Sequence, residues 1–314
     1  MTAPAPAEPA EPAPASLEVI AAGPLTLLQD AGRPGLAHLG VTASGAADLG
    51  AYGAANRLVG NRVGSATLET VLGGLEVRAL RPVLVAVTGA PATLDVRSAT
   101  GRTVLHPTGT SITLGPGERL RVLPPAVGLR SYLAVRGGVD AEPVLGSRSR
   151  DVLSGMGPPP LQAGDLLRVA GEEGAWPSAT LIPPPREPHQ ADAIAPTPGI
   201  LHLVRGPRDE WFGDAGWHQL LETTWDVTAA SNRVGVRVSC AHPLRRAPAF
   251  EGAELPSEGM VAGAVQVPPD GQPVVFLRDH PVTGGYPVIG VLAAAAIDLL
   301  AQVRPGDAVR FAGR

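Results

Sequence analysis

The sequence predicts a mainly β protein with a few helices, built from two similar halves. Short apolar runs of strand length are separated by turn residues, and the 314-residue chain contains 39 glycines and 34 prolines. Gly and Pro are the residues that most often end strands and form turns. Because 44% of the residues are hydrophobic, the chain can bury a full core, so the composition indicates a folded β-rich protein rather than a disordered one.

Two Pro-rich segments divide the chain. Residues 1–16 begin with MTAPAPAEPAEPAPA, a tail whose prolines preclude a helix and whose side chains give a core nothing to bury, so we expect it to be disordered. Residues 171–198 contain GEEGAWPSAT, PPPREPHQ and PTPG, which indicate a linker. The sequence therefore predicts an N-terminal half over 17–170 and a C-terminal half over 199–314.

Strands are predicted wherever an apolar run of four or five residues lies between turn residues. In the first half these runs lie at 83–87, 112–114, 120–123, 132–135 and 166–169, and in the second at 201–204, 234–238, 261–267, 274–277 and 309–311. A helix is predicted over 48–59, with Asp48 as its N-cap. A second helix is predicted over 288–302; it is Ala-rich and apolar on nearly all sides, so it should be buried.

Short phrases recur in the two halves. LQAGDLLRV (161–169) closes the first half and VRPGDAVRF (303–311) closes the second, while NRLVG (56–60) loosely parallels NRVG (232–235). A Gly-Asp turn before a strand is common, so chance similarity is the alternative interpretation. We interpret the phrases as the trace of a duplicated β-rich domain.

The chain contains 25 basic residues, all of them arginine. Without lysine there is no Schiff-base chemistry of the PLP or aldolase type, no Walker A loop, and no lysine to carry biotin or lipoate. Any anion must be held by Arg, backbone N–H groups or a metal. GC-rich coding explains the arginine bias equally well, but the chemical exclusions hold under either explanation.

Charge and motifs exclude further classes. A net charge of −4 gives no basic surface for nucleic acid. The longest apolar run, 288–297, is too short to span a membrane, and the N-terminus has no signal-peptide pattern, so a cytoplasmic protein is expected. The one cysteine, Cys240, excludes an internal disulfide. No histidine pair has zinc-site spacing and no G-x-S-x-G elbow occurs, so we predict no metal site and no serine hydrolase.

Three polar clusters in the first half are candidates for binding. Gln29 and Arg33 flank a tight Gly/Pro turn, Asp48 and Asn56 share one side of the predicted helix, and Glu69 stands among apolar residues. Each cluster has a structural alternative: an Asp–Arg pair that holds the turn, a helix cap with a surface Asn, and a solvated strand face.

Two clusters in the second half have a clearer pattern. In the first, Gln266 follows an apolar run, and a wet strand face is the alternative. In the second, a strand leads into Asp279 and then into Thr283, Gly284, Gly285 and Tyr286. Loop amides followed by a helix N-terminus form an anion site, while a tight strand-to-helix turn is the structural alternative.

These clusters resemble the biotin-dependent carboxyltransferase-type family, which includes the C-type component of prokaryotic 5-oxoprolinase, allophanate-hydrolase-subunit-2-like proteins and the carboxyltransferase part of urea amidolyase. The resemblance covers residues 17–314. In the first half it rests on GPLTLLQDAGRPG (23–35), Ser44-Gly45 with Asp48, NRLVGN (56–61), LET (68–70), TGA (88–90), YLAVRGG (132–138), LGSRS (145–149) and Gly164-Asp165. In the second half it rests on SNRVG (231–235), GAVQVP (263–268), Asp279 and TGGYP (283–287).

The resemblance implies tandem cyclophilin-like β-barrel domains and one of two chemistries. The A-type, B-type and C-type components of 5-oxoprolinase together couple ATP hydrolysis to the opening of 5-oxoproline to glutamate. The carboxyltransferase branch moves CO2 from carboxybiotin to urea or a related amide. In the first chemistry ATP serves the complex and is not necessarily bound by this chain; in the second, biotin arrives on a separate carrier.

A regulatory role is the third alternative that the resemblance leaves open. In that role the chain would be a binding component that antagonises a kinase-inhibitor-like partner. The 5-oxoprolinase and regulatory alternatives both imply a partner of the B type, and the 5-oxoprolinase alternative also implies one of the A type.

The resemblance also suggests roles for residues. Asp279 is the acid or base, Gln266, Tyr286 and Asn56 orient an amide, and Gly284 and Gly285 offer backbone N–H donors. Arg33 or Arg148 holds a carboxylate, and Gln29, Asp48, Glu69 and Thr283 complete the candidate substrate-binding set. Two departures stand out: Pro281-Val282-Thr283 replaces Gln-Thr-Thr, which removes a polar amide near Asp279, and Ser44-Gly-Ala-Ala-Asp48 replaces Ser-Gly-Pro-Met-Asp.

Overall fold

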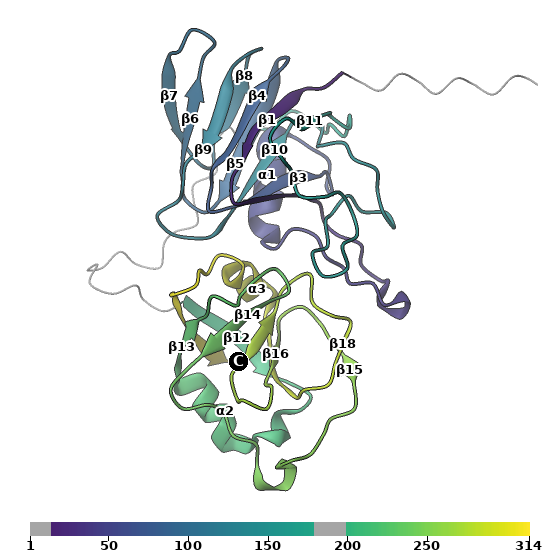
Figure 1. Cartoon of the computed structure of the whole chain (residues 1–314), viewed down its shortest axis with the longest axis vertical. Coiled ribbons are helices and arrows are strands. Elements are labelled where there is room, and N and C mark those ends of the chain that lie inside the picture. The colour runs from purple at the N-terminus through teal and green to yellow at the C-terminus, as the bar shows by residue number, and fades with distance from the viewer. Residues whose placement is uncertain (1–13, 179–198) are drawn as a thin grey trace, which may run out of the picture.

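The computed structural model describes residues 14–178 and 199–314, which form two β-rich halves stacked along the long axis of the molecule (Figure 1). The predicted disordered tail, apart from residues 14–16, and most of the predicted linker lie outside the described residues. No helix in the two described stretches is long and apolar enough to cross a membrane.

Two antiparallel sheets pack face to face in the first half. The six-stranded sheet has the order β11 (Leu166–Leu167), β1 (Leu17–Ala22), β4 (Leu75–Ala79), β9 (Arg119–Val122), β6 (Thr93–Arg97) and β7 (Thr103–Pro107). The five-stranded sheet has the order β2 (Leu25–Gln29), β3 (Thr67–Val71), β10 (Arg130–Val135), β5 (Val83–Gly89) and β8 (Ser111–Leu114). One apolar cluster contains side chains from both sheets, among them Val77 and Leu120 from one and Leu68 and Leu133 from the other. The core of this half therefore lies between the sheets.

Helix α1 (Leu49–Val59) covers the other face of the five-stranded sheet. Asp48 is its N-cap, as predicted, because the Asp48 carboxylate accepts a hydrogen bond from the Ala51 N–H at 2.8 Å. Gly60 ends the helix with a positive φ of 65°. The short η1 turn (Ala37–Leu39) precedes the helix.

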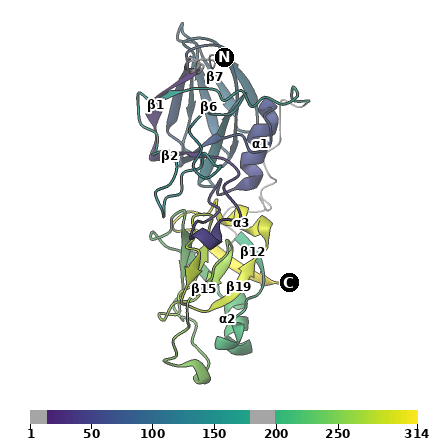
Figure 2. The same cartoon turned by 90° about the vertical axis from the view of Figure 1, so that its right-hand side faces the viewer.

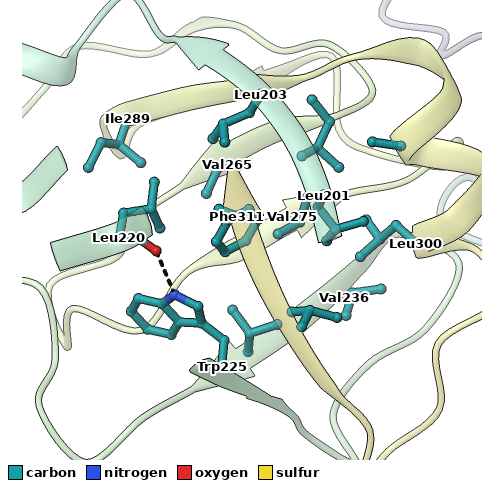
Figure 3. Close-up of a cluster of buried hydrophobic side chains, with 14 of the residues drawn as sticks. Leu201, Leu203, Leu220, Trp225, Val236, Val265, Val275, Ile289, Leu300 and Phe311 are labelled. Carbon is teal, nitrogen blue, oxygen red and sulfur yellow. Dashed lines mark hydrogen bonds between the residues drawn. The ribbon is translucent and has the colours of Figure 1, made fainter. Parts of the chain in front are cut away.

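The second half is a closed seven-stranded barrel. Its order is β12 (Gly199–Arg205), β19 (Val288–Leu292), β16 (Ala264–Gln266), β17 (Val274–Phe276), β14 (Gly235–Ser239), β13 (Thr224–Val227) and β20 (Ala308–Gly313), and parallel pairing of β20 with β12 closes it. Figure 3 shows the barrel core, where the fully buried Trp225 donates its indole N–H to the Leu220 carbonyl oxygen at 3.0 Å. The remaining elements are α2 (Gly213–Glu222), α3 (Ala294–Leu300), the turns η2 (Asp209–Trp211) and η3 (Pro248–Phe250), and the β15 (Glu258–Gly259) and β18 (Thr283–Gly284) pair.

The mainly β class with a few helices is confirmed, but the helix predicted over 288–302 is wrong in its first third. Residues 288–292 form strand β19, and only residues 294–300 are helical. Three of the five β19 residues are β-branched, which favours a strand. The sequence pattern does not predict helix α2. Closure also differs between the halves, since the first half is two facing sheets and only the second is a closed barrel.

The structure shows where the first half ends and which of the repeated phrases share a local structure. Residues 171–178 pack on the first half, where the Gly174 N–H donates to the Gly60 carbonyl oxygen at 2.8 Å, so this half extends past residue 170. Both Gly-Asp phrases form the same turn: φ is 95° at Gly164 and 91° at Gly306. The looser Asn-Arg parallel has no common structure, because Asn56 lies in a helix and Asn232 in a turn.

Candidate functional site at the seam between the two halves

A layer of buried polar side chains joins the two halves, in the zone where Figures 1 and 2 place α1 above α3. We call this contact the seam. Its centre, the seam network, consists of Ser44, Glu69, Arg130 and Tyr132 from the first half and Arg233 and Asp279 from the second. All six side chains are at most 3% exposed. Charges buried so deeply require partners, and each finds them across the seam.

Asp279 has no exposed surface. Its carboxylate accepts hydrogen bonds from the Ser44 hydroxyl at 2.7 Å, the Val152 N–H at 2.9 Å and the Arg233 Nε at 3.0 Å. Ser44 reaches it from a positive φ of 49°, a conformation that is costly for a residue other than Gly. The carboxylate therefore accepts hydrogen bonds from donors in both halves.

Arg233 is the central cation of the seam network. Its guanidinium donates to Asp279, to Glu69 and, at 2.5 Å, to the Gly45 carbonyl oxygen. Burial opposes the charged form, but the carboxylates of Glu69 and Asp279 outweigh it and raise the pKa of Arg233 above its ordinary range. The residue therefore stays charged and binds both halves at once.

Glu69 is the matching anion in the first half. One of its oxygens accepts from the Ala47 N–H at 2.9 Å and from the Tyr132 hydroxyl at 2.8 Å, and the other faces Arg233 and lies 3.5 Å from Arg130 Nε. Burial would raise the pKa of Glu69, but Arg233, Arg130 and the Ala47 N–H hold it below its ordinary value of 4.5. Glu69 is thus an ionised, fully paired carboxylate rather than a solvated strand residue.

A second set of contacts surrounds the start of α1. The Asp48 carboxylate accepts from the Gln302 side chain at 2.8 Å, and Asp298 accepts from the Leu49 and Gly50 N–H groups at 3.0 and 3.1 Å. Burial raises the pKa of Asp48, and the nearby Asp298 and Glu69 carboxylates add to this rise. The first helix of the first half is therefore capped in part by side chains of the second half.

Gln29, Arg33 and Arg148 all engage the loop between 141 and 151. Gln29 Nε2 donates to the Arg150 carbonyl oxygen at 2.8 Å, and Arg33 Nη2 donates to that of Ser149 at 2.5 Å. Arg148 is partly exposed and pairs with Glu172 at 2.9 Å. Since the same loop continues to Val152, these residues support the seam from within the first half.

Asn56 lies away from the seam. Its side-chain N–H donates to the Ser65 carbonyl oxygen at 3.0 Å, and its oxygen accepts from Asn61 at 2.8 Å. Both ends of this buried amide are thus used to fasten α1 to the loop that follows it. Its predicted role in orienting a substrate stays a prediction.

The remaining predicted residues belong to strand β18, the residues that follow it, and the end of strand β16, and Figure 1 shows the β15–β18 pair next to β16. We call them the outer group: Gln266, Thr283, Gly284, Gly285 and Tyr286. Val265 points into the barrel core, so the adjacent Gln266 faces outward, where its amide donates to the Tyr286 carbonyl oxygen at 3.1 Å. A Cβ on Gly284 would lie 2.6 Å from the Gln266 side-chain nitrogen, so the backbone here passes directly over the amide.

The outer group offers hydrogen-bonding groups that a ligand can reach. Tyr286 is 43% exposed and Thr283 is also exposed, whereas Gln266 is buried beneath them, with 6% of its surface exposed. Hydroxyl and carboxamide groups both donate and accept, which suits an amide or lactam. In the described residues no group of three or more His, Cys, Asp or Glu side chains is arranged to hold a metal ion.

The structure therefore brings most of the predicted residues together in two places, the seam and the outer group, which residues 279–283 link. Asn56 lies in neither place. Sequence reasoning missed Arg233, Arg130, Tyr132, Ser44, Asp298 and Gln302 as members of the site. Arg233, Ser44 and Tyr132 had a signal, because each lies within a phrase that carries the family resemblance. Arg130, Asp298 and Gln302 carried none, because their partners lie in the opposite half or on a distant strand.

A two-sheet half joined to a closed barrel through this seam defines a carboxyltransferase-type domain. The chain belongs to the family described as carboxyltransferase domain, subdomain A and B, whose model matches residues 39–313. The resemblance noted in the sequence is thereby confirmed at the level of the family.

The chain is similar to enzyme components of two kinds. It is 34% identical to the C component of 5-oxoprolinase from Escherichia coli (strain K12), over 94% of this chain and 90% of that protein. It is 31% identical to urea amidolyase of Lachancea kluyveri, over 95% of this chain but 17% of that protein.

Solved structures show the same two-part fold. The chain matches TTHA0988 with 32% identity and a TM-score of 0.81, over 99% of this chain and 59% of that one. Kluyveromyces lactis urea carboxylase matches with 28% identity and the same TM-score of 0.81, over 96% of this chain and 27% of that one.

Proposed function

We propose that this chain is the C-type component of an ATP-dependent 5-oxoprolinase, which opens 5-oxoproline to glutamate together with A-type and B-type partners. The observation that carries the proposal is the similarity to the C component of 5-oxoprolinase, which spans 94% of this chain and 90% of the relative. The urea amidolyase match covers a small part of that much longer protein.

The outer group is the proposed substrate contact. Opening a lactam needs a polarised carbonyl and a proton delivered to nitrogen. Tyr286, Thr283 and Gln266 supply neutral donors and acceptors, and Gly284 and Gly285 leave the backbone accessible at the same place. Of the two arginines predicted to hold a carboxylate, Arg33 is only 3% exposed and Arg148 already pairs with Glu172 of the first half, so that role stays a prediction for both.

Asp279 enters the proposal through its position as much as through its acidity. Its carboxylate is buried and already accepts from Ser44, Val152 and Arg233, so proton exchange with a substrate would require these contacts to part. We therefore propose that Asp279 anchors the segment that leads to Thr283 and Tyr286. The substitution Asp279→Asn tests the acid–base role first predicted for Asp279.

The partners supply what the chain lacks. With no lysine, any contact to ATP phosphates from this chain would use arginine, backbone N–H groups or a metal. We propose ATP as a substrate of the complex rather than of this chain alone. The proposed complex is soluble and lies in the cytoplasm. The second function, carboxyl transfer from biotin on a separate carrier to urea or a related amide, is favoured by the match to K. lactis urea carboxylase.

Reconstitution separates these functions. The chain is purified with its A-type and B-type partners, supplied with 5-oxoproline and ATP, and assayed for glutamate and ADP. Both products should form in equal amounts, and Tyr286→Phe should lower kcat/KM about 10-fold or more, in the range of one lost catalytic hydrogen bond. The matched control is Tyr52→Phe, since Tyr52 lies in α1 with its hydroxyl buried against Ser65.

Three results would redirect the proposal. Urea-dependent turnover of carboxybiotin without glutamate formation would assign the carboxyltransferase function. Full glutamate formation by the partners without this chain would favour the regulatory role. Unchanged activity after Asp279→Asn would remove Asp279 from any direct proton transfer.

A further inference from the structure

We propose that Arg233 is a positioning residue for the seam site: it fixes the segment from Asp279 to Tyr286 against the first half and thereby sets the geometry of the outer group. This inference rests on the proposed function of the outer group. It extends that function, because Arg233 itself is buried and contacts no substrate.

The geometry of the guanidinium supports this role. Its nitrogens reach acceptors on three separate segments, namely Glu69 on β3, the Gly45 carbonyl oxygen before α1, and Asp279 after β17. A planar fork that is held at three points has a defined orientation, whereas a single ammonium group could not make all three contacts. Arg233 therefore determines position as well as charge.

The charge balance of the seam network also depends on Arg233. Glu69 and Asp279 are two buried carboxylates, and Arg130 and Arg233 are the two buried arginines that face them. Without Arg233 the network would hold two anions and one cation out of contact with water. Such an imbalance is relieved by protonation or by opening the contact to solvent.

The orientation passes from Arg233 to the outer group along a short path. Asp279 is held by Arg233, by the strained Ser44 and by the Val152 N–H. Four residues later the chain enters β18 at Thr283, which pairs with Gly259 of β15. A shift of the Asp279 anchor therefore moves Thr283, and with it Gly284 above the Gln266 amide.

Two variants separate positioning from simple stabilisation. Arg233→Lys keeps the charge and loses the fork. The double variant Arg233→Met and Asp279→Asn removes one cation and one anion while it keeps similar volumes, so Glu69 stays paired with Arg130 and no charge remains buried alone. Arg205→Met is the control, since Arg205 forms comparable ion pairs with Asp209 and Asp214 on the surface of the same half.

Amide hydrogen exchange on the isolated chain measures how well the N–H groups of the seam are protected, and it requires no activity assay. We expect the N–H groups of Val152 and Ala47, which donate to Asp279 and Glu69, to exchange at least 10-fold faster in Arg233→Lys. Arg205→Met should leave both at the wild-type rate. Wild-type exchange in Arg233→Lys would overturn the proposal.

Steady-state kinetics of the assembled complex measure how each variant affects the outer group. In Arg233→Lys we expect kcat/KM for 5-oxoproline to fall at least 10-fold, mostly through KM. The double variant should recover the wild-type melting temperature but not the wild-type KM. Full recovery of KM together with stability would show a merely structural role and overturn the proposal. If the double variant does not fold, Arg233→Lys alone decides.

Failure of the proposed function is distinguishable from failure of this inference. A wild-type complex that forms no glutamate contradicts the proposed function. The exchange experiment needs no substrate, so it still decides whether Arg233 holds the seam.

Discussion

At the scale of single residues, two neighbouring buried carboxyl groups in the seam have pKa values that are shifted in opposite directions. Burial raises the pKa of Asp48, which has no arginine among its hydrogen-bond partners. The pKa of Glu69 falls despite deeper burial, because Arg233 and Arg130 lie against it. The position of a guanidinium, rather than the depth of burial, therefore decides in which direction the pKa of each carboxyl group is shifted.

This contrast predicts the response of stability to acid. The pKa of Glu69 is lower in the folded state, so its contribution is present above about pH 4.5 and is lost as pH falls through the folded value. The pKa of Asp48 is raised, so its contribution is lost as pH rises and regained as pH falls. We expect Asp48→Asn to lose stability more steeply than the wild type between pH 7 and pH 3, as measured by urea midpoints. Parallel curves for the two proteins would contradict this expectation.

Glycine at 284 should matter for function more than for folding. A Cβ there would lie 2.6 Å from the Gln266 nitrogen and 3.2 Å from the Met260 sulfur, so Gly284→Ala must displace the amide. We expect kcat/KM of the complex to fall about 10-fold or more, with little change in melting temperature, because the displaced groups are side chains. Gly259→Ala on the paired strand meets no atom within 4 Å and serves as the control. Equal activities of the two variants would argue against the outer group as the substrate contact.

The residues that sequence can identify are those with local partners. Asp48 is predictable as an N-cap because its partner, Ala51, lies three positions away. Arg233 and Glu69 are 164 positions apart, and no periodicity relates them. The resemblance selects Asp279 by its place in a phrase, but it does not reveal that the carboxylate is buried.

At the scale of elements, the region after Tyr286 shows how apolar runs mislead. Ten apolar residues in sequence fit a buried helix or a buried strand equally well. The chain uses both, with β19 ending at Leu292 and α3 beginning at Ala294. The alanines that follow the β-branched residues mark the change, because Ala favours helix and Val and Ile favour strand.

Helix α1 gives a prediction about capping across the seam. Asp298→Ala removes the acceptor for the Leu49 and Gly50 N–H groups, while Asp48 still caps Ala51. Loss of a cap costs about 0.5–2 kcal/mol, and we expect a loss in this range in chemical unfolding. Leu299→Ala, at a neighbouring exposed position, is the control. Unchanged stability of Asp298→Ala would show that Asp48 alone completes the cap.

At the scale of the whole molecule, the seam joins the halves through backbone groups as well as through charges. Gln302 accepts from the Leu129 and Arg130 N–H groups at 3.0 and 2.9 Å. Arg304 donates to the carbonyl oxygens of Pro125 and Ala126 at 2.8 and 3.2 Å. The contact is thus built from paired polar groups whose exposure would be costly, which favours joint unfolding.

We therefore expect the two halves to unfold in one calorimetric transition. Gln302→Ala leaves the Leu129 and Arg130 N–H groups and the Asp48 carboxylate without this partner. The loss should be about 1–3 kcal/mol for each group left buried and unpaired, and the transition should broaden or split. Gln219→Ala removes contacts within the second half only and should preserve a single transition. A split transition in the wild type would contradict joint unfolding.

The capping of α1 by Asp298 has a consequence for biosynthesis. Residues 49 and 50 leave the ribosome long before residue 298, which lies 249 positions beyond Leu49. Until the second half has been made, those two N–H groups lack Asp298, and Glu69 has Arg130 but lacks Arg233. The nascent first half is thus an incomplete folding unit, because the capping of α1 is completed only after α3 has been synthesised. Water hydrates these polar groups in the meantime, so formation of the seam exchanges hydrogen bonds to water for hydrogen bonds within the protein.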